Sequence, residues 1–426
     1  MKMKSLDFHE FDLPNKLHCI LYKDNSLPVI NLSVGYNVGS KDEDLKKKGI
    51  AHLFEHLMFQ GSGNVKKNEH FEFILKSGGT NNAFTMQDAT LYYNTVPSNK
   101  LELALWLESD RMNSLDLTEE NLANQKNVVI EEKKQRYENS PYGNLFNDIM
   151  KNTFPDSNYE SSIIGEAEDI NSVTVSEAVE FHNKYYTPEN SILMISGDID
   201  LSNAEENIKK YFSDIKKENN IVRKENIIKD LEDDVNEVLY DFIQLPLYSK
   251  SYIIPKAGSP SELSLEFFTE IIANNKSSRL FKKLVYEKKI LQSVKANMIM
   301  LKDAGVLFFK ALYNQKINHE DIRKEIDEEI NEFVIKGISD EEFETVRNQI
   351  EFRFTSFYSK LINISIDSTL NHLIFKNAAR INDQLSQYLS VSKEEIINSV
   401  NEFLINKKSV SLTYLPMNLK KIELAG

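Results

Sequence analysis

The order of expected strands and helices repeats once along the chain, and this long repeat constrains the fold more than any other feature. In each half, two strands rich in Ile, Leu and Val precede two helices, two more strands and further helices. The expected strands are Leu17–Tyr22, Val29–Val38, Thr80–Met86 and Ala89–Val96 in the first half, with a last strand at Ser191–Ser196. In the second half they are Val238–Gln244, Ser249–Ile254, Leu291–Met300 and Val306–Tyr313, with a last strand at Val410–Tyr414. This order predicts an α+β fold of two similar domains, each a mostly antiparallel sheet with helices packed on one face.

The boundary between the two expected domains is a charged segment. Residues 216–234 are rich in Lys, Glu and Asp and contain neither Gly nor Pro, which is typical of a solvated linker. The sequence therefore predicts one α+β domain over 1–215, a linker over 216–234 and a second, similar domain over 235–426. A length of 426 residues suits two or three domains.

Charge and apolar patterning exclude several classes of partner. Lys and Arg number 51 against 65 Asp and Glu, a net charge of −14. This balance argues against binding to nucleic acid or to anionic membranes, because both require a basic surface. No apolar run approaches the roughly 18 residues of a membrane helix, so we expect no membrane span.

The N-terminus and the cysteine content bear on the compartment. The first residues, MKMKSLD, carry charge with no apolar core behind them, so they are not a signal peptide as written. The expected location is cytoplasmic, or periplasmic if a signal was removed before residue 1. The one cysteine, Cys19, excludes an internal disulfide and any metal site built from several cysteines.

The segment Gly49–Gly61, GIAHLFEHLMFQG, carries the pattern that most directly predicts chemistry. His52 and His56 are four residues apart, so a helix places both imidazoles on one face, where they can reach one metal ion. Glu55 projects near the same face, close enough to contact a metal-bound water without ligating the metal. The alternative is a pair of core histidines hydrogen-bonded to Glu55.

A catalytic zinc usually has three protein ligands and one water, so the motif requires a third ligand elsewhere in the chain. Three other histidines are candidates, as is any carboxylate on a helix. These histidines are His18, His70 and His182.

The helix expected over Thr118–Tyr137 offers such a carboxylate. Its buried stripe consists of Leu122, Gln125, Val128, Val129 and Glu132. Glu131 falls instead on an all-polar stripe, so Glu132 is the better ligand candidate. The alternative for Glu132 is an ion pair with Arg136 at i+4, which is common and contributes little.

The segment Ser77–Val96 predicts a strand at the edge of a sheet. Asn81 and Asn82 are poor strand formers, so their backbone or side chains are expected to bond something other than a neighbouring strand. A free edge beside a metal can hold an extended peptide by strand addition. The alternative is a plain hairpin whose polar edge prevents aggregation.

Together these segments resemble the pitrilysin or insulinase family of zinc peptidases with the inverted HxxEH motif. Within that family the chain looks most similar to short, single-half members of the mitochondrial processing peptidase beta type. The match covers nearly the whole chain and is most specific in residues 36–137. Besides the HxxEH segment, it rests on GGTNNAFT at 78–85, LWLESDRM at 105–112, VVIEEKKQR at 128–136, YYTP at 185–188 and SSRL at 277–280.

The resemblance implies a reaction and a site. One zinc per chain would be held by His52, His56 and Glu132, the last 76 positions after His56 (132 − 56), as the family spacing requires. Glu55 would exchange protons with the attacking water and the leaving amine. The substrate, a short or unfolded peptide, would lie along Asn82, Ala83 and Phe84. The family often has an acidic residue where this chain has Gln125.

The resemblance also implies a partner. Family members enclose a chamber between two halves of a clamshell, and this chain supplies one half. The opposite half carries an Arg and a Tyr seven residues apart, whose aligned positions here are Val285 and Gln292. Arg279 and Tyr286 have the same spacing but the wrong register. We therefore expect a heterodimer with a zinc-less homologue that carries the pair, with a homodimer as the alternative.

Three functions follow from these readings. The first is the active subunit of a zinc endopeptidase, and the second is a non-catalytic peptide-binding or assembly subunit of the same fold. A metal-dependent enzyme for non-peptide substrates is the third, and no feature of the sequence supports it. The presence of His52, Glu55, His56 and Glu132 together favours the active peptidase.

Overall fold

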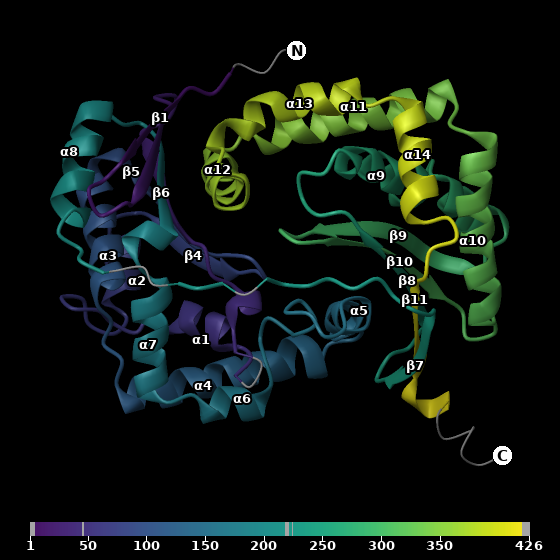
Figure 1. The fold of residues 1–426 in the computed structure, drawn as a ribbon, viewed down its shortest axis with the longest axis horizontal. Helices are drawn as coiled ribbons and strands as arrows, with labels where there is room; N and C mark the ends of the chain where they lie inside the picture. The colour runs from purple at the N-terminus through teal and green to yellow at the C-terminus, as the bar shows by residue number, and fades with distance from the viewer. Residues whose placement is uncertain (1–4, 45–46, 218–220, 224, 420–426) are drawn as a thin grey trace. The chain divides into compact units, whose positions relative to one another are not determined.

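The computed structural model describes residues 5–44, 47–217, 221–223 and 225–419, and the chain forms two compact units (Figure 1). The first unit contains 1–132, 161–225 and 354–385, and the second contains 133–160, 226–353 and 386–426. The predicted domains are continuous in the chain, 1–215 and 235–426. In the structure, 133–160 belongs to the second unit and 354–385 to the first. In the predicted linker 216–234, residues 218–220 and 224 lie outside the described part.

The first unit contains a six-stranded sheet of order β1-β2-β6-β3-β5-β4. All neighbouring strands are antiparallel except β2 and β6, which are parallel. The edge strand β1 carries mostly exposed residues and was not among the expected strands. The strands are β1 (Phe8–Asp12), β2 (His18–Lys23), β3 (Val29–Tyr36), β4 (Thr80–Thr85), β5 (Thr90–Pro97) and β6 (Ser191–Gly197).

The second unit contains a five-stranded sheet of order β7-β11-β8-β10-β9, again with one parallel pair, β7 and β11. Apart from β1, the two sheets have the same order: first, last, second, fourth and third strand. The predicted fold class, two similar α+β units with mostly antiparallel sheets, is confirmed. The strands are β7 (Val235–Asp241), β8 (Leu247–Ile254), β9 (Leu291–Met300), β10 (Gly305–Tyr313) and β11 (Val410–Pro416).

The helices of the first unit come from the first half of the chain except α12, which lies in the range predicted for the second domain. The long helix expected over Thr118–Tyr137 is α-helical only to Lys133, and a short π-helix, η3 (Lys134–Glu138), continues it into the second unit. The α-helices are α1 (Ile50–Leu57), α2 (Glu69–Lys76), α3 (Leu101–Asn113), α4 (Glu119–Lys133), α6 (Ala167–Ser172), α7 (Val175–Tyr185), α8 (Leu201–Phe212) and α12 (Leu361–Phe375). The 3₁₀ segments are η1 (Ser40–Asp42), η2 (Ser98–Lys100), η4 (Pro188–Asn190) and η7 (Ala378–Arg380).

The helices of the second unit occupy the matching places in the chain. Between β8 and β9 lie α9 with its π-helical continuation η5, and then η6, as α1 and α2 lie between β3 and β4. After β10 come α10 and α11, as α3 and α4 follow β5. The bounds are α5 (Leu145–Thr153), α9 (Ser261–Thr269), η5 (Glu270–Asn274), η6 (Phe281–Glu287), α10 (His319–Lys336), α11 (Asp340–Phe357), α13 (Ile381–Ser390) and α14 (Lys393–Phe403).

Helix α12 returns to the first unit from far along the chain and packs across β3 and β6. The approach is close, because a Cβ at Gly35 would lie 2.6 Å from the Thr369 side chain. The Ser33 and Ser365 hydroxyls are hydrogen-bonded at 2.9 Å, and Leu373 joins a buried apolar cluster with Ile20. One face of the first sheet is thus covered by a helix that lies more than 300 positions after three of its strands, β1, β2 and β3.

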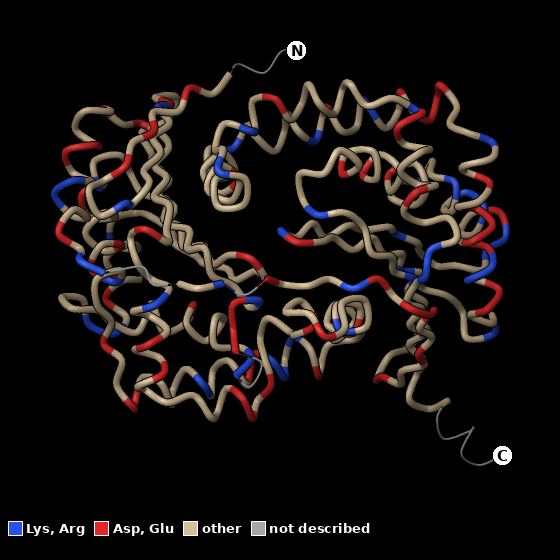
Figure 2. The backbone as a smooth tube through the Cα atoms, in the orientation of Figure 1, with Lys and Arg blue, Asp and Glu red and all other residues tan. Residues whose placement is uncertain are grey.

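Charged residues of both signs alternate along both units (Figure 2), so the net charge of −14 does not come from one acidic segment. Within the described residues, the chain contains no helix that is both long enough and apolar enough to cross a membrane.

Candidate active site

Helix α1, which carries the HxxEH motif, has a specific start. Gly49 adopts a φ of 90° there, and a Cβ at that position would lie 2.4 Å from the Ile164 carbonyl oxygen, so glycine is required. The Glu43 carboxylate accepts hydrogen bonds from the Gly49 and Ala51 N–H groups at 2.9 and 2.8 Å. Burial raises the pKa of Glu43 to about 8 despite these two bonds. The N-terminal turn of α1 is therefore fixed by a buried acidic group.

The three proposed metal ligands lie together in the first unit. His52 and Glu132 approach at 3.8 Å (Nε2 to Oε1), and His56 and Glu132 approach at 3.3 Å (Nε2 to Oε2). One ligand atom from each residue lies within 4.8 Å of the others. Zinc bonds of about 2.0–2.2 Å to His and carboxylate ligands require atoms about 3.3 Å apart in a tetrahedral site. The donor set therefore fits a zinc ion with one open position.

Glu55 lies next to this cluster and has a fixed orientation. The Thr85 hydroxyl, at the end of β4, donates a hydrogen bond to Glu55 Oε2 at 2.6 Å. This contact joins α1 to β4, which pack against each other (Figure 1). Sequence reasoning missed this role of Thr85, although Thr85 ends the GGTNNAFT segment and its position in the strand was the available signal.

Strand β4 is an edge strand beside the cluster, paired only with β5 among the described strands. The Ala83 N–H donates a hydrogen bond to the side-chain oxygen of Asn82 at 2.9 Å rather than to β5. Both residues line a pocket of about 360 Å³, which also contains Glu55 and His56. The predicted third residue, Phe84, lies against Tyr93 with ring centroids 6.2 Å apart.

One residue that lines this pocket, Gln125, departs from the family pattern. Gln125 of α4 is 8% exposed and lines the pocket with Glu55 and His56. Glu131 is exposed, whereas the Glu132 side chain is 17% exposed. Gln125 thus lines the pocket, Glu132 lies with His52 and His56, and Glu131 is on the exposed face. Val128, expected on the buried stripe, is 47% exposed, because it lies at the open side of the pocket.

The other histidines named as ligand candidates lie elsewhere. His70 is buried against Phe59, and burial together with Arg111 lowers its pKa well below the usual range. His182 donates to the Arg111 carbonyl at 3.0 Å and accepts from Lys217 at 3.0 Å. Both are core histidines with structural contacts. His18 belongs to a separate cluster described below.

A buried ion pair supports the pocket from inside the unit. Arg111 bonds Glu108 through Nε at 2.9 Å, and Asn94 donates to the same carboxylate at 2.6 Å. The Arg111 guanidinium also lies over the rings of Tyr92 and Phe59, 4.5 and 4.9 Å from their centroids. Removing one partner of such a pair leaves an uncompensated buried charge and costs about 3–5 kcal/mol.

The second unit contains the aligned positions of the family's Arg and Tyr. Val285 lies in η6 and Gln292 in β9. Arg279 instead bonds the Glu342 carboxylate at 2.7 and 2.9 Å and the Gly337 carbonyl at 2.6 Å. These contacts fix Arg279 inside its own unit, in keeping with its assignment to the Ser-Arg-Leu turn.

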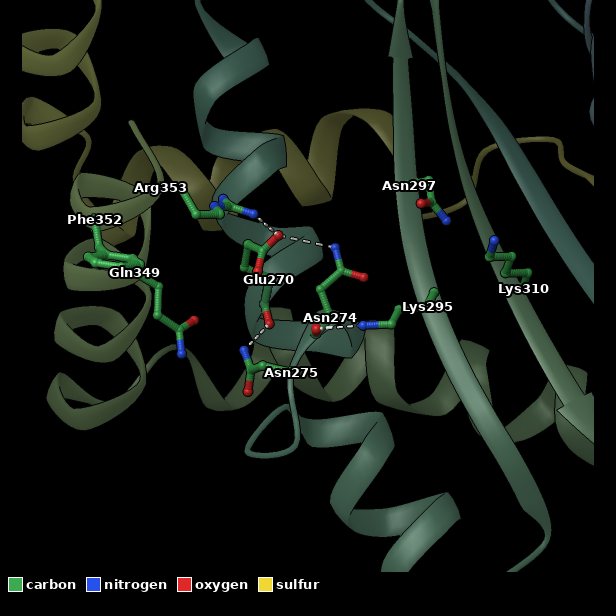
Figure 3. A pocket seen from close by; sticks show the side chains of 9 residues that line it. All are labelled: Glu270, Asn274, Asn275, Lys295, Asn297, Lys310, Gln349, Phe352 and Arg353. Atoms are coloured by element: carbon green, nitrogen blue, oxygen red, sulfur yellow. Dashed lines mark hydrogen bonds and ion pairs between the residues drawn. The ribbon is translucent and has the colours of Figure 1, made fainter. Parts of the chain in front are cut away.

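A second polar pocket, of about 580 Å³, lies in the second unit (Figure 3). Glu270 at its centre bonds Arg353 at 2.8 Å and Asn274 at 3.3 Å. Lys295 of β9 bonds the Asn274 carbonyl at 2.8 Å. The elements that line it, η5, β9 and α11, hold the same places in the second unit as α1, β4 and α4 hold in the first.

Two family models match the chain. The model for insulinase, peptidase family M16, matches residues 19–167, and the model for the peptidase M16 inactive domain matches residues 172–350. The chain belongs to peptidase family M16, which is the pitrilysin and insulinase family that the motifs indicated. The narrower likeness to the mitochondrial processing peptidase beta type stays a prediction.

Relatives and solved structures agree with this assignment. The zinc protease PqqE of Helicobacter pylori is 26% identical over 396 residues, 92% of this chain and 89% of that protein. An uncharacterized zinc protease of Rickettsia felis is 23% identical over 405 residues, 93% of this chain and 95% of that one.

Similar crystal structures cover nearly the whole chain. That of a protease from Helicobacter pylori matches with a TM-score of 0.90 and 26% identity, covering 97% of this chain and all of that one. The periplasmic protease PqqL of Escherichia coli shares the fold at 17% identity, with a TM-score of 0.79. The match includes 99% of this chain but only 49% of PqqL. The chain therefore corresponds in fold to half of that longer protein.

Proposed function

We propose that this chain is the catalytic subunit of a zinc-dependent endopeptidase for short or unfolded peptides. The observation that carries the proposal is the placement of His52, His56 and Glu132 around one point beside an open strand edge. Zinc held there would supply a Lewis acid that activates water and polarises the scissile carbonyl. The names of the relatives, zinc proteases, support the same metal.

The chain's own residues would perform the proton transfers. Glu55 takes a proton from the attacking water and later delivers it to the leaving amine nitrogen. Thr85 holds the carboxylate by its 2.6 Å hydrogen bond and so keeps Glu55 directed toward the pocket. A side chain that transfers protons must lie within hydrogen-bond reach of both the attacking water and the leaving amine. The hydrogen bond from Thr85 would hold Glu55 in such a position.

The edge of β4 would hold the substrate as an added strand. The N–H of Ala83 faces away from the β5 ladder and is occupied by the Asn82 side chain. A peptide carbonyl can replace that side chain, leaving Asn82 to bond elsewhere on the peptide. Main-chain pairing tolerates many sequences, so selectivity would come from pockets for the substrate side chains.

A second subunit would complete the enzyme. Val285 and Gln292 cannot replace an Arg and a Tyr, so we propose a heterodimer with a zinc-less homologue that carries both, and a homodimer is the alternative. The correspondence with half of a longer M16 chain fits a protein built from two halves. The compartment, cytoplasmic or periplasmic, stays a prediction from the sequence.

The test compares two variants in which one carboxylate becomes an amide. Glu55→Gln should keep zinc but lose peptidase activity by several orders of magnitude, because an amide cannot accept the proton. Glu131→Gln, on the exposed face of α4, should change neither zinc content nor activity. Zinc is measured by mass spectrometry and activity with fluorogenic peptides, for the chain alone and mixed with the homologue.

Each result has a clear reading. Near wild-type turnover by Glu55→Gln would refute its role as the base. Bound zinc without turnover, alone and with the homologue, would favour the non-catalytic peptide-binding subunit. Robust turnover by the isolated homodimer would refute the need for a heterologous partner.

A further inference from the structure

A second group of metal-ligating side chains lies at the other edge of the first unit's sheet. Glu10 of β1, His18 of β2 and His372 of α12 each offer one ligand atom within 4.8 Å of the others. Strands β1 and β4 form the two opposite edges of the sheet, so this group is separate from the candidate active site. Its members lie up to 362 positions apart in the chain (372 − 10), and only folding brings them together.

The hydrogen bonds of His18 indicate a cation. Its Nδ1 lies 2.8 Å from Asp12 Oδ1, and its Nε2 lies 3.0 Å from Glu10 Oε2. A neutral imidazole has one N–H, so when Nδ1–H bonds Asp12, the Nε2 lone pair faces a carboxylate. Two acceptor atoms 3.0 Å apart, His18 Nε2 and Glu10 Oε2, repel each other unless a proton or a metal cation lies between them. A histidine fixed by a carboxylate on its far nitrogen is the usual arrangement of a metal ligand.

His372 supplies the second imidazole and an independent observation. It is 9% exposed, and its Nδ1 is buried without a hydrogen-bond partner among the described residues. That atom lies 3.9 Å from Glu10 Oε2, and the His372 ring lies 3.9 Å from the His18 ring, centroid to centroid. A buried polar atom with no partner is costly, and a metal ion would satisfy it.

The surroundings also favour a cation that keeps a water ligand. His372 lies in the last turn of α12, where the helix dipole favours positive charge. The side chains of Glu10 and His18 are 34% and 19% exposed, which leaves room for a water. Two imidazoles and a carboxylate suit first-row divalent cations such as zinc rather than calcium or magnesium.

We propose that Glu10, His18 and His372 bind a second divalent cation of the zinc class, with Asp12 positioning His18. The cation would join the β1–β2 hairpin to α12 and so link the first and last segments of the first unit. The alternative is a protonated His18 that bridges the two carboxylates and binds no metal.

Metal titration of the metal-free, full-length protein tests the proposal, with Co²⁺ and Zn²⁺ as the probes. His18→Gln and His372→Gln should each bind one equivalent fewer than the wild-type chain. His9→Gln is the matched control, because His9 is the neighbour of Glu10 on β1 but bonds Glu205 instead. His56→Ala should remove a different equivalent, so failure of the candidate active site and failure of this site can be told apart.

Two further measurements separate a ligand from a structural role. Asp12→Asn should keep the number of ions but weaken binding at this site by roughly 10- to 100-fold, as loss of a carboxylate behind a metal-bound histidine does. Zinc should raise the melting temperature of the His56→Ala variant but not that of His56→Ala combined with His372→Gln. If His18→Gln does not fold, Glu10→Gln replaces it. Equal stoichiometry in the wild type and the folded variants would overturn the proposal in favour of the protonated bridge.

Discussion

The two units share a strand order and a succession of helices, yet their equivalent pockets differ in charge. In the first, Glu55, His56 and Gln125 line the pocket beside β4. The second pocket, beside β9, contains Glu270 paired with Arg353. The second pocket contains basic side chains, because Arg353 bonds Glu270 and Glu266, and Lys295 and Lys310 also line it. In the first unit, two carboxylates, Glu55 and Glu132, lie beside two imidazoles instead.

The same arrangement of secondary-structure elements thus carries side chains of different chemistry in the two units. Imidazoles ligate metals in the neutral state, so a site of two histidines and an ionised carboxylate would carry negative charge that a divalent cation can balance. In the second pocket the Glu270 carboxylate already has a cationic partner, Arg353, which also bonds Glu266. The position of helix, edge strand and long helix is common to both pockets, so under the proposed function the side chains decide which of them would bind a metal.

Removal of a metal ligand should have the largest effect. His56→Ala should lower the zinc content by one ion per chain and reduce turnover on the order of 1,000-fold or more, because both water activation and carbonyl polarisation are lost. Glu270→Gln, the corresponding change in the second pocket, should leave zinc content and turnover near wild type. Equal loss in both variants would mean that the two pockets act together. Zinc analysis and peptide assays on the assembled enzyme decide this.

Proline at position 83 should have the next largest effect. Ala83→Pro removes an N–H that faces away from the β5 ladder, so the sheet should persist while substrate pairing is lost. We expect KM to rise by about 10-fold or more, or turnover to disappear, with zinc retained. Asn82→Ala keeps the Ala83 N–H and removes only the Asn82 side chain, so it should raise KM less than Ala83→Pro. Normal KM in Ala83→Pro would contradict binding by strand addition.

The cap of α1 should give the first unit a pH-dependent stability. The folded state holds the Glu43 proton up to about pH 8, whereas the unfolded chain loses it near 4.5. Stability should therefore fall as pH rises from about 4.5 to 8, by up to about 1.4 kcal/mol per pH unit. Glu43→Gln should remove this slope and match the wild type near pH 5. Denaturant unfolding at several pH values measures it, and an unchanged slope would exclude Glu43 as its source.

The ion pair of the second pocket should have the smallest effect. Arg353→Leu leaves Glu270, 8% exposed, without its guanidinium partner and should destabilise the protein by about 1–3 kcal/mol. Replacing both residues by Leu should restore part of that loss, because Glu270 is then no longer a buried charge, although Glu266 also loses its contact with Arg353. Denaturant unfolding of the two variants measures both effects. Zinc content should not change in either variant, and a change would show that the pockets are coupled.

Local periodicity accounts for what the sequence predicted well. The spacing of His52 and His56 sets their common face as soon as a helix forms, and the apolar stripe of α4 separates Glu132 from Glu131 in the same way. The repeated strand order required only hydrophobic runs and turn residues. By contrast, β1 was missed because its FHEFD sequence is mostly polar and exposed, and an edge strand buries too little to leave an apolar pattern.

The sequence by itself thus determined the two-fold repeat, the fold class and the pairing of two histidines with a glutamate on one helix. Tertiary structure decided which segments each unit contains. Residues 133–160 belong to the second unit and 354–385 to the first, although the segments that adjoin them in the chain belong to the other unit. It also decided that Thr85 holds Glu55, and that His18, a candidate ligand in the sequence, lies with Glu10 and His372 instead. These contacts join residues tens to hundreds of positions apart, and no local pattern encodes them, since they form only when strands and helices pack.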